Sequence, residues 1–161
     1  MAFNKEKQFL DNVEAINLAF SLSFQGRKAN DLEVEKLSNY KGFGGLNEVL
    51  LDPENDTLWD GSKAKFRPLV SALHETIERH RPNQKQDYIR SVKNSVLTSY
   101  YTPLPVVDAI GKSFNKNEID FANILDPSAG SGIFSDSLRK FNKPNDFLSY
   151  EKDLLTGLIL S

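Results

Sequence analysis

The sequence predicts a mostly α-helical N-terminal half followed by the beginning of an α/β unit. Two observations predict this. Apolar residues recur at helical spacing through the first hundred residues, and two short apolar runs around a glycine-rich turn and an amphipathic segment then follow between residues 122 and 150. We therefore divide the chain into a helical domain at 1–97 and the first, incomplete part of an α/β domain at 98–161.

The first helix is expected over residues 5–24, since its apolar residues recur at i, i+4, i+7 and i+11. Gly26 follows as a stop signal. A second, short helix opens with a predicted capping box, in which Asn30 is followed three positions later by Glu33. The apolar positions that define the first helix are Phe9, Val13, Ile16 and Phe20.

A glycine-rich turn and a loop interrupt the helices. Residues 42–45 (GFGG) predict either a tight turn between helices or a backbone contact to phosphate or DNA, and the turn is the preferred interpretation. Residues 52–62 predict a loop, in which we expect Trp59 to be a packing residue rather than a stacking surface for a ligand.

Two more helices are predicted before residue 97. Helical spacing runs from Phe66 to Ile77, with Pro68 tolerated because it lies in the first turn. Asn83 and Gln86 form a second predicted capping box, which would open the next helix.

The pattern changes after residue 100. Thr102 and Pro103 predict a helix start, with the hydroxyl as the cap and the proline at the first helical position. Residues 122–126 and 147–150 predict two short strands, separated by a glycine-rich turn and a helix. This order is that of a βαβ unit.

Composition excludes several classes of protein. The chain has no cysteine, which excludes thiol catalysis, disulfides and cysteine-ligated zinc. His74 and His80 are six positions apart and do not share a helix face, so we expect no metal site. No apolar run approaches the roughly 20 residues that span a bilayer, so we expect no membrane partner and a cytoplasmic location.

Charge is distributed unevenly along the chain. Residues 1–61 carry a net charge of −5, residues 62–93 a net charge of +5 and residues 94–161 a net charge of −2. The basic middle block is either a surface for nucleic-acid phosphate or two solvated helix faces, of which the second is the more common outcome. Its cations are Lys63, Lys65, Arg67, Arg79, Arg81, Lys85, Arg90 and Lys93.

The turn at residues 126–132 (DPSAGSG) carries the strongest chemical signal. Glycines at the carboxyl end of a strand let a ligand approach the backbone, and amides at the start of the next helix can bind an anion or carboxylate. Glu151 lies 21 positions after Gly130, at the tip of the second strand, where an acid can accept hydrogen bonds from ribose hydroxyls. This combination favours a cofactor that contains a nucleoside.

The identity of that cofactor follows by comparison of motifs. The dinucleotide fingerprint would need a small residue three positions after Gly132, where Ser135 is only a fair substitute. The phosphate-loop pattern fails, because Val106 stands where its leading glycine would precede Gly111-Lys112-Ser113. A ligand with a ribose and a carboxylate but no phosphate fits better, which indicates S-adenosylmethionine.

These motifs resemble those of a known family. The turn at 126–132 looks like the cofactor loop of amino-methylating DNA methyltransferases, and residues 99–103 (SYYTP) look like the segment before that loop in the adenine-N6 enzymes, although Leu104 replaces their second proline. The resemblance implies a Rossmann-like class I methyltransferase core, truncated in this chain, with DNA as partner. It implies that cofactor contacts are made by Tyr101, Thr102, Pro103, Asp126, Ala129, Gly130, Gly132 and Glu151.

The family's target-base motif, Asn/Asp-Pro-Pro-Tyr/Phe, has no counterpart, since the sequence contains no Pro-Pro pair. The apolar residues 154–160 look like the start of a helix meant to cover a sheet. We therefore expect an N-terminal portion of a methyltransferase that is inactive alone. The helical N-terminal half with residues 42–45 (GFGG) resembles more loosely the methylase–helicase proteins of phages and conjugative elements. The alternatives are a helical DNA- or partner-binding module with a relic cofactor loop, or a methyltransferase acting on RNA or a protein glutamine.

Overall fold

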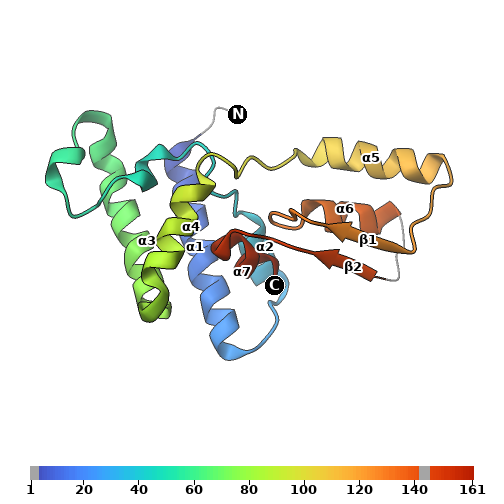
Figure 1. Cartoon of the computed structure of the whole chain (residues 1–161), viewed down its shortest axis with the longest axis horizontal. Helices are drawn as coiled ribbons and strands as arrows, with labels where there is room; N and C mark the ends of the chain where they lie inside the picture. Colours follow the sequence, from blue (N-terminus) through green and yellow to red (C-terminus); the bar gives the residue numbers. More distant parts are fainter. Residues whose placement is uncertain (1–3, 142–145) are drawn as a thin grey trace.

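A computed structural model of the chain describes residues 4–141 and 146–161. Figure 1 shows a helical body, built from α1 to α4 with α7 against it, and an extension formed by α5, α6 and two strands. Within the described residues, no helix is long and apolar enough to cross a membrane.

The helical body consists of α1 (Lys5–Gln25), α2 (Asp31–Ser38), α3 (Arg67–His80) and α4 (Lys85–Ser95). The first helix contacts α2, α3 and α7, and α4 packs on α3 and α7. The predicted helix over 5–24 is confirmed, and Gly26 ends it with a left-handed φ of 62°. The turn from α1 into α2 is therefore made at the glycine that the sequence indicated.

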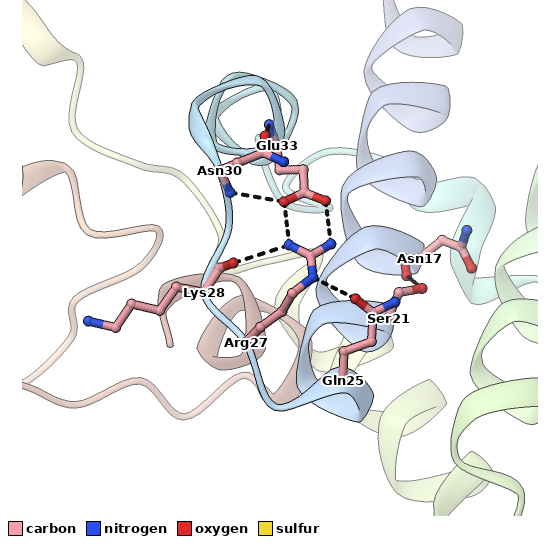
Figure 2. A network of polar contacts seen from close by, with 7 residues as sticks. All are labelled: Asn17, Ser21, Gln25, Arg27, Lys28, Asn30 and Glu33. Atoms are coloured by element: carbon pink, nitrogen blue, oxygen red, sulfur yellow. Dashed lines mark hydrogen bonds and ion pairs between the residues drawn. The ribbon is translucent and has the colours of Figure 1, made fainter.

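The predicted capping box of α2 is also present. The Asn30 side chain accepts a hydrogen bond from the Glu33 amide at 3.0 Å, and Glu33 accepts one from the Asn30 amide at 2.9 Å. Arg27, just after α1, forms a bidentate ion pair with Glu33 (Figure 2). Its two terminal nitrogens each donate to one Glu33 carboxylate oxygen at 2.7 Å. The Arg27 hydrogen bonds, followed by the Asn30 amide, lower the pKa of Glu33 to about 2.

Two other predicted caps are wrong. The residues before α4 form a 3-10 turn, Pro82–Gln84, so Asn83 lies inside that turn and lacks the extended backbone that a cap requires. The next helix, α5 (Leu104–Lys116), begins after Pro103, and Thr102 does not cap it. Pro105, with no N–H to donate, occupies the first turn of α5 instead.

The core lies within the helical body. The predicted face of α1 is confirmed, since Phe9, Ile16 and Phe20 are fully buried and Val13 packs against them. Trp59 is buried and its indole N–H donates to the Asp52 carbonyl at 2.8 Å, as expected of a packing residue. Other core members are Tyr40, Phe43, Leu46, Val49, Phe66, Val70, Leu73, Ile77, Ile89, Val92, Val96 and Leu155.

The extension is a single βαβ unit. Strands β1 (Asn123–Asp126) and β2 (Asp146–Ser149) pair in parallel, with Leu125 opposite Leu148. Helix α6 (Ile133–Phe141) connects the turn after β1 to the second strand and packs along α5. Both predicted strands are therefore present: β1 begins one residue later than predicted, and β2 lies one residue earlier at both ends.

The predicted Rossmann-like methyltransferase core is wrong for this chain. The described residues are mainly helical, and their sheet has only the strands β1 and β2. The last helix, α7 (Leu154–Leu160), does not cover a sheet as expected; it packs on α1 and α4. Leu155 is fully buried in the core of the helical body, which explains why this apolar segment leaves the extension.

The start of α7 is tied to α4 by polar contacts. Asp153 caps α7 by accepting from the Thr156 amide at 2.7 Å, and it accepts from the Ser91 hydroxyl at 2.7 Å. Ser91 in turn accepts from the Leu154 amide at 2.9 Å. The division of the chain at residue 98 stays a prediction, but residues on both sides of it build one core.

Candidate functional site

A pocket of about 550 Å³ lies where the helical body meets the βαβ unit. Its walls come from the end of α4, from the segment 98–102, from the turn 128–131 and from residues 151–153. Five of the eight predicted cofactor residues line it: Tyr101, Thr102, Ala129, Gly130 and Glu151.

The turn after β1 is tied to the end of β2. The Ala129 amide donates to the Tyr150 carbonyl and the Tyr150 amide donates to the Asp126 carbonyl, both at 2.8 Å. Gly130 and Gly132 have φ values of 56° and 86°, which favour glycine over residues with a side chain. The tight turn therefore exposes its backbone beside the residue that follows β2.

Glu151 joins this turn to the start of α7. Its carboxylate accepts hydrogen bonds from the Gly130 amide at 2.8 Å and from the Asp153 amide at 2.7 Å, one on each oxygen. A carboxylate oxygen can accept more than one hydrogen bond, so Glu151 retains capacity for ribose hydroxyls while it holds the turn.

The ring of Tyr101 also lines the pocket and packs directly on Gly130. A Cβ added to Gly130 would lie 3.0 Å from this ring, so only glycine allows so close an approach without displacement. The Tyr101 hydroxyl shares a hydrogen bond with the Thr156 hydroxyl at 3.1 Å. Burial raises the pKa of Tyr101, so the phenol stays protonated at neutral pH.

Three predicted cofactor residues do not line the pocket. Pro103 is exposed at the start of α5. Asp126 accepts from the Ser128 amide at 3.1 Å through one oxygen, while its other oxygen is buried and has no hydrogen-bond partner among the described residues. Gly132 borders a different groove, where a Cβ would lie 2.9 Å from Leu160.

The charge of the pocket limits the ligands that fit. Glu151 and Asp153 are acidic, Lys152 is the one cation among the lining residues, and most others carry hydroxyl or amide groups. A diphosphate needs several donors or cations to balance its charge, whereas a nucleoside with a cationic sulfonium and ammonium suits an acidic wall. The two carboxylates therefore suit a cationic ligand better than a diphosphate.

Sequence reasoning missed the contribution of the helical body. Ser91 and Asn94 of α4 line the pocket, and Thr156 of α7 forms a hydrogen bond with the Tyr101 hydroxyl. No local pattern marks them, because isolated polar residues in amphipathic helices usually face solvent. Only the docking of α7 against α4 brings them to the site.

Ion pairs partly offset the charge of the basic block at 62–93. Five of its eight cations pair with carboxylates at 2.5–3.9 Å within the described residues. These pairs weaken the positive field that a phosphate-binding surface needs. The paired cations are Lys63, Lys65, Arg67, Lys85 and Arg90.

Among residues 4–141 and 146–161, no cluster of three potential metal-ligating side chains occurs. Comparison with protein-family models, with curated proteins and with solved structures found no match to this chain.

Proposed function

We propose that the chain binds S-adenosylmethionine in the 550 Å³ pocket and supplies the cofactor-binding part of a DNA adenine-N6 methyltransferase. One observation carries this proposal. Tyr101, Gly130 and Glu151, named as cofactor contacts from motifs far apart in the sequence, meet around one pocket through direct contacts. Gly130 and Glu151 follow two adjacent parallel strands, which places them side by side, and the helical body brings Tyr101 onto them from a separate segment.

Each of the three residues has a role in the proposed complex. Glu151 accepts hydrogen bonds from the ribose hydroxyls, in addition to those from Gly130 and Asp153. Gly130 lets the Tyr101 ring pack directly on the turn, and Tyr101 with Thr102 borders the methionine end of the ligand. When bound, S-adenosylmethionine supplies an electrophilic methyl group on its sulfonium sulfur.

Transfer of that group requires an acceptor and residues that orient it. DNA adenine is the proposed acceptor because the segment 99–103 resembles the adenine-N6 enzymes. The sequence holds no Pro-Pro pair and hence no counterpart of their base-orienting motif. In this proposal the chain holds the cofactor and takes no chemical step by itself.

Calorimetric titration with S-adenosylmethionine tests the proposal. Gly130→Ala places a methyl group against Tyr101, whereas Gly61→Ala places one in open space at a similar positive φ of 51°. We expect saturable binding in the wild type and in Gly61→Ala, and its loss in Gly130→Ala and in Glu151→Ala. A parallel titration with NAD is expected to give no saturable heat.

Two results would overturn the proposal. One is the absence of saturable binding by a folded wild-type chain, and the other is equal affinity in Gly130→Ala and Gly61→Ala. If binding is present, S-adenosylhomocysteine, adenosine and methionine are each tested as competitors of S-adenosylmethionine. Their relative affinities report which ends of the ligand the pocket holds. A choice between DNA, RNA and protein acceptors then needs the transfer assay of a methyltransferase that contains this chain.

A further inference from the structure

The glycine turn at residues 42–45 lies directly against the segment that carries Tyr101. A Cβ on Gly44 would lie 2.1 Å from the Ser99 carbonyl oxygen, an overlap that no side-chain movement relieves. A Cβ on Gly42 would lie 2.9 Å from the Tyr101 hydroxyl oxygen, and its φ is 70°. The Gly45 amide donates to the Val96 carbonyl at 3.1 Å. The turn is thus shaped to receive residues 96–101.

The opposite side of this turn is anchored in α1. The Gly42 carbonyl accepts hydrogen bonds from the side chains of Asn12 at 2.7 Å and Gln8 at 2.9 Å. Asn12 is fully buried and also accepts from the Lys41 amide at 2.9 Å. A buried asparagine with these bonds to backbone holds the turn in one position, because each bond would be costly to leave unmade.

Three hydroxyl groups connect the helical body to the pocket wall. The Tyr40 hydroxyl shares a hydrogen bond with Thr156 Oγ1 at 3.0 Å, and Thr156 Oγ1 shares a second one with the Tyr101 hydroxyl at 3.1 Å. Tyr40 is 2% exposed and Thr156 is 1% exposed, so water does not replace either partner. Thr156 is therefore the central link between a core tyrosine and the tyrosine on Gly130.

We infer that Thr156 and the glycine turn 42–45 are positioning elements that hold Tyr101 over Gly130, so that the helical body forms part of the ligand site. The inference deepens the proposed S-adenosylmethionine site and rests on it for its consequence in binding. The structural part of the inference does not depend on the ligand. Removing the Thr156 hydroxyl, or placing a side chain at Gly44 where the Ser99 carbonyl packs, releases the segment 98–102 from the turn 128–131.

The central test compares Thr156→Val with Thr156→Ser. Valine keeps the shape of threonine but removes the hydroxyl, so that the buried Tyr40 hydroxyl loses its side-chain partner and Tyr101 loses its bond to Thr156, whereas serine keeps the hydroxyl. We expect Thr156→Val to weaken S-adenosylmethionine binding about tenfold, the factor that one buried hydrogen bond accounts for, and Thr156→Ser to bind within about twofold of the wild type. A role in packing alone predicts the reverse order, because serine loses the methyl group.

Hydrogen–deuterium exchange measured without ligand gives the second readout. In Thr156→Val we expect exchange in residues 98–102 and 128–131 to rise about tenfold, with α1 unchanged. Tyr40→Phe removes only the hydroxyl farthest from the pocket in the series Tyr40–Thr156–Tyr101, so we expect a smaller rise in exchange in the same residues. The variants are compared well below their melting temperatures so that global unfolding does not contribute.

A second pair of variants tests the turn. Gly44→Ala meets the Ser99 carbonyl, whereas Gly26→Ala meets nothing within 4 Å at a φ of 62°. We expect raised exchange at 98–102 in Gly44→Ala alone. The inference would be overturned if Thr156→Val and Gly44→Ala both showed the exchange rates and the S-adenosylmethionine affinity of the wild type. If the wild type binds no S-adenosylmethionine yet the exchange pattern changes as expected, the proposed function fails while the positioning role stands.

Discussion

The helical body and the βαβ extension differ in how completely they bury their apolar residues. In the body, Phe9, Ile16 and Phe20 are fully buried. In the extension, Leu125 and Leu148 are neighbours on the paired strands β1 and β2, and they are 61% and 53% exposed. A two-stranded sheet has too little surface to bury on both faces and is marginal alone. The comparison teaches that the body supplies the stability and that the extension depends on its attachments to the body.

Those attachments coincide with the candidate site. Leu155 joins the core, Asp153 is held by Ser91 of α4, and Tyr101 is held by Thr156. Figure 1 shows α7 returning from the strands to lie against the helical body. The pocket therefore lies at the joint between a well-buried and a more exposed part, and variants on either side of the joint test this contrast.

Removal of a core aromatic is expected to give the largest effect. Phe9→Ala should lower the free energy of unfolding by about 3–5 kcal/mol, because it leaves a cavity among fully buried side chains. Phe24→Ala, on the same helix but 87% exposed, should change it by less than about 0.5 kcal/mol. Urea denaturation measures both values, and equal losses would contradict the assignment of the core to this face of α1.

The attachment of α7 is tested by two neighbouring leucines. Leu155→Ala should cost about 2–5 kcal/mol, because this side chain is fully buried in the core. Leu154→Ala should cost about 1 kcal/mol or less, since that side chain is 43% exposed. Hydrogen exchange at β2 should increase in Leu155→Ala alone; an unchanged β2 would mean that the extension holds its structure without the body.

The anchoring of the glycine turn predicts an intermediate effect. Asn12→Leu leaves the Lys41 amide unpaired and removes one of two donors to the Gly42 carbonyl, at a cost of about 1–3 kcal/mol. Gln8→Leu removes the other donor only and should cost about 1 kcal/mol or less. Thermal melts measure the loss of stability in each variant. A greater loss in Gln8→Leu than in Asn12→Leu would contradict this prediction.

The smallest effect is expected at the junction drawn in Figure 2 and depends on pH. The folded-state pKa of Glu33 is about 2, below its ordinary value of 4.5, so its contribution is present above pH 4.5 and is lost as pH falls toward 2. Glu33→Gln should flatten the fall in urea midpoint between pH 5 and pH 2.5. Glu35→Gln, an exposed neighbour on the same helix, serves as control, and an identical pH profile for wild type and Glu33→Gln would refute the role of this ion pair.

Much of the fold was predictable from local signals. Amphipathic spacing located α1 and α3, and Gly26 and the Asn30 capping box marked helix ends correctly, because these signals act within one turn of helix. The caps at Asn83 and Thr102 failed because neighbouring prolines shifted the helix starts. The larger α/β core was inferred from motifs, and motifs do not report how many strands a chain contributes.

The candidate site was predictable in part for the same reason. The glycine turn after β1 and Glu151 carry sequence signals, and the structure brings them into contact. Thr156 carries no such signal, since a threonine within the apolar run 154–160 shows its partner only once α7 has packed on the helical body. Gly44 was visible as part of a turn, but its contact with Ser99 joins residues 55 positions apart.

The most direct test of the pocket is a hydrogen-exchange comparison of the wild-type chain with and without saturating S-adenosylmethionine. The account predicts that protection appears together in residues 98–102, 128–131 and 151–153, three of the segments that form its walls. Protection that is absent from these segments, or confined to the groove beside Gly132 and Leu160, would contradict it.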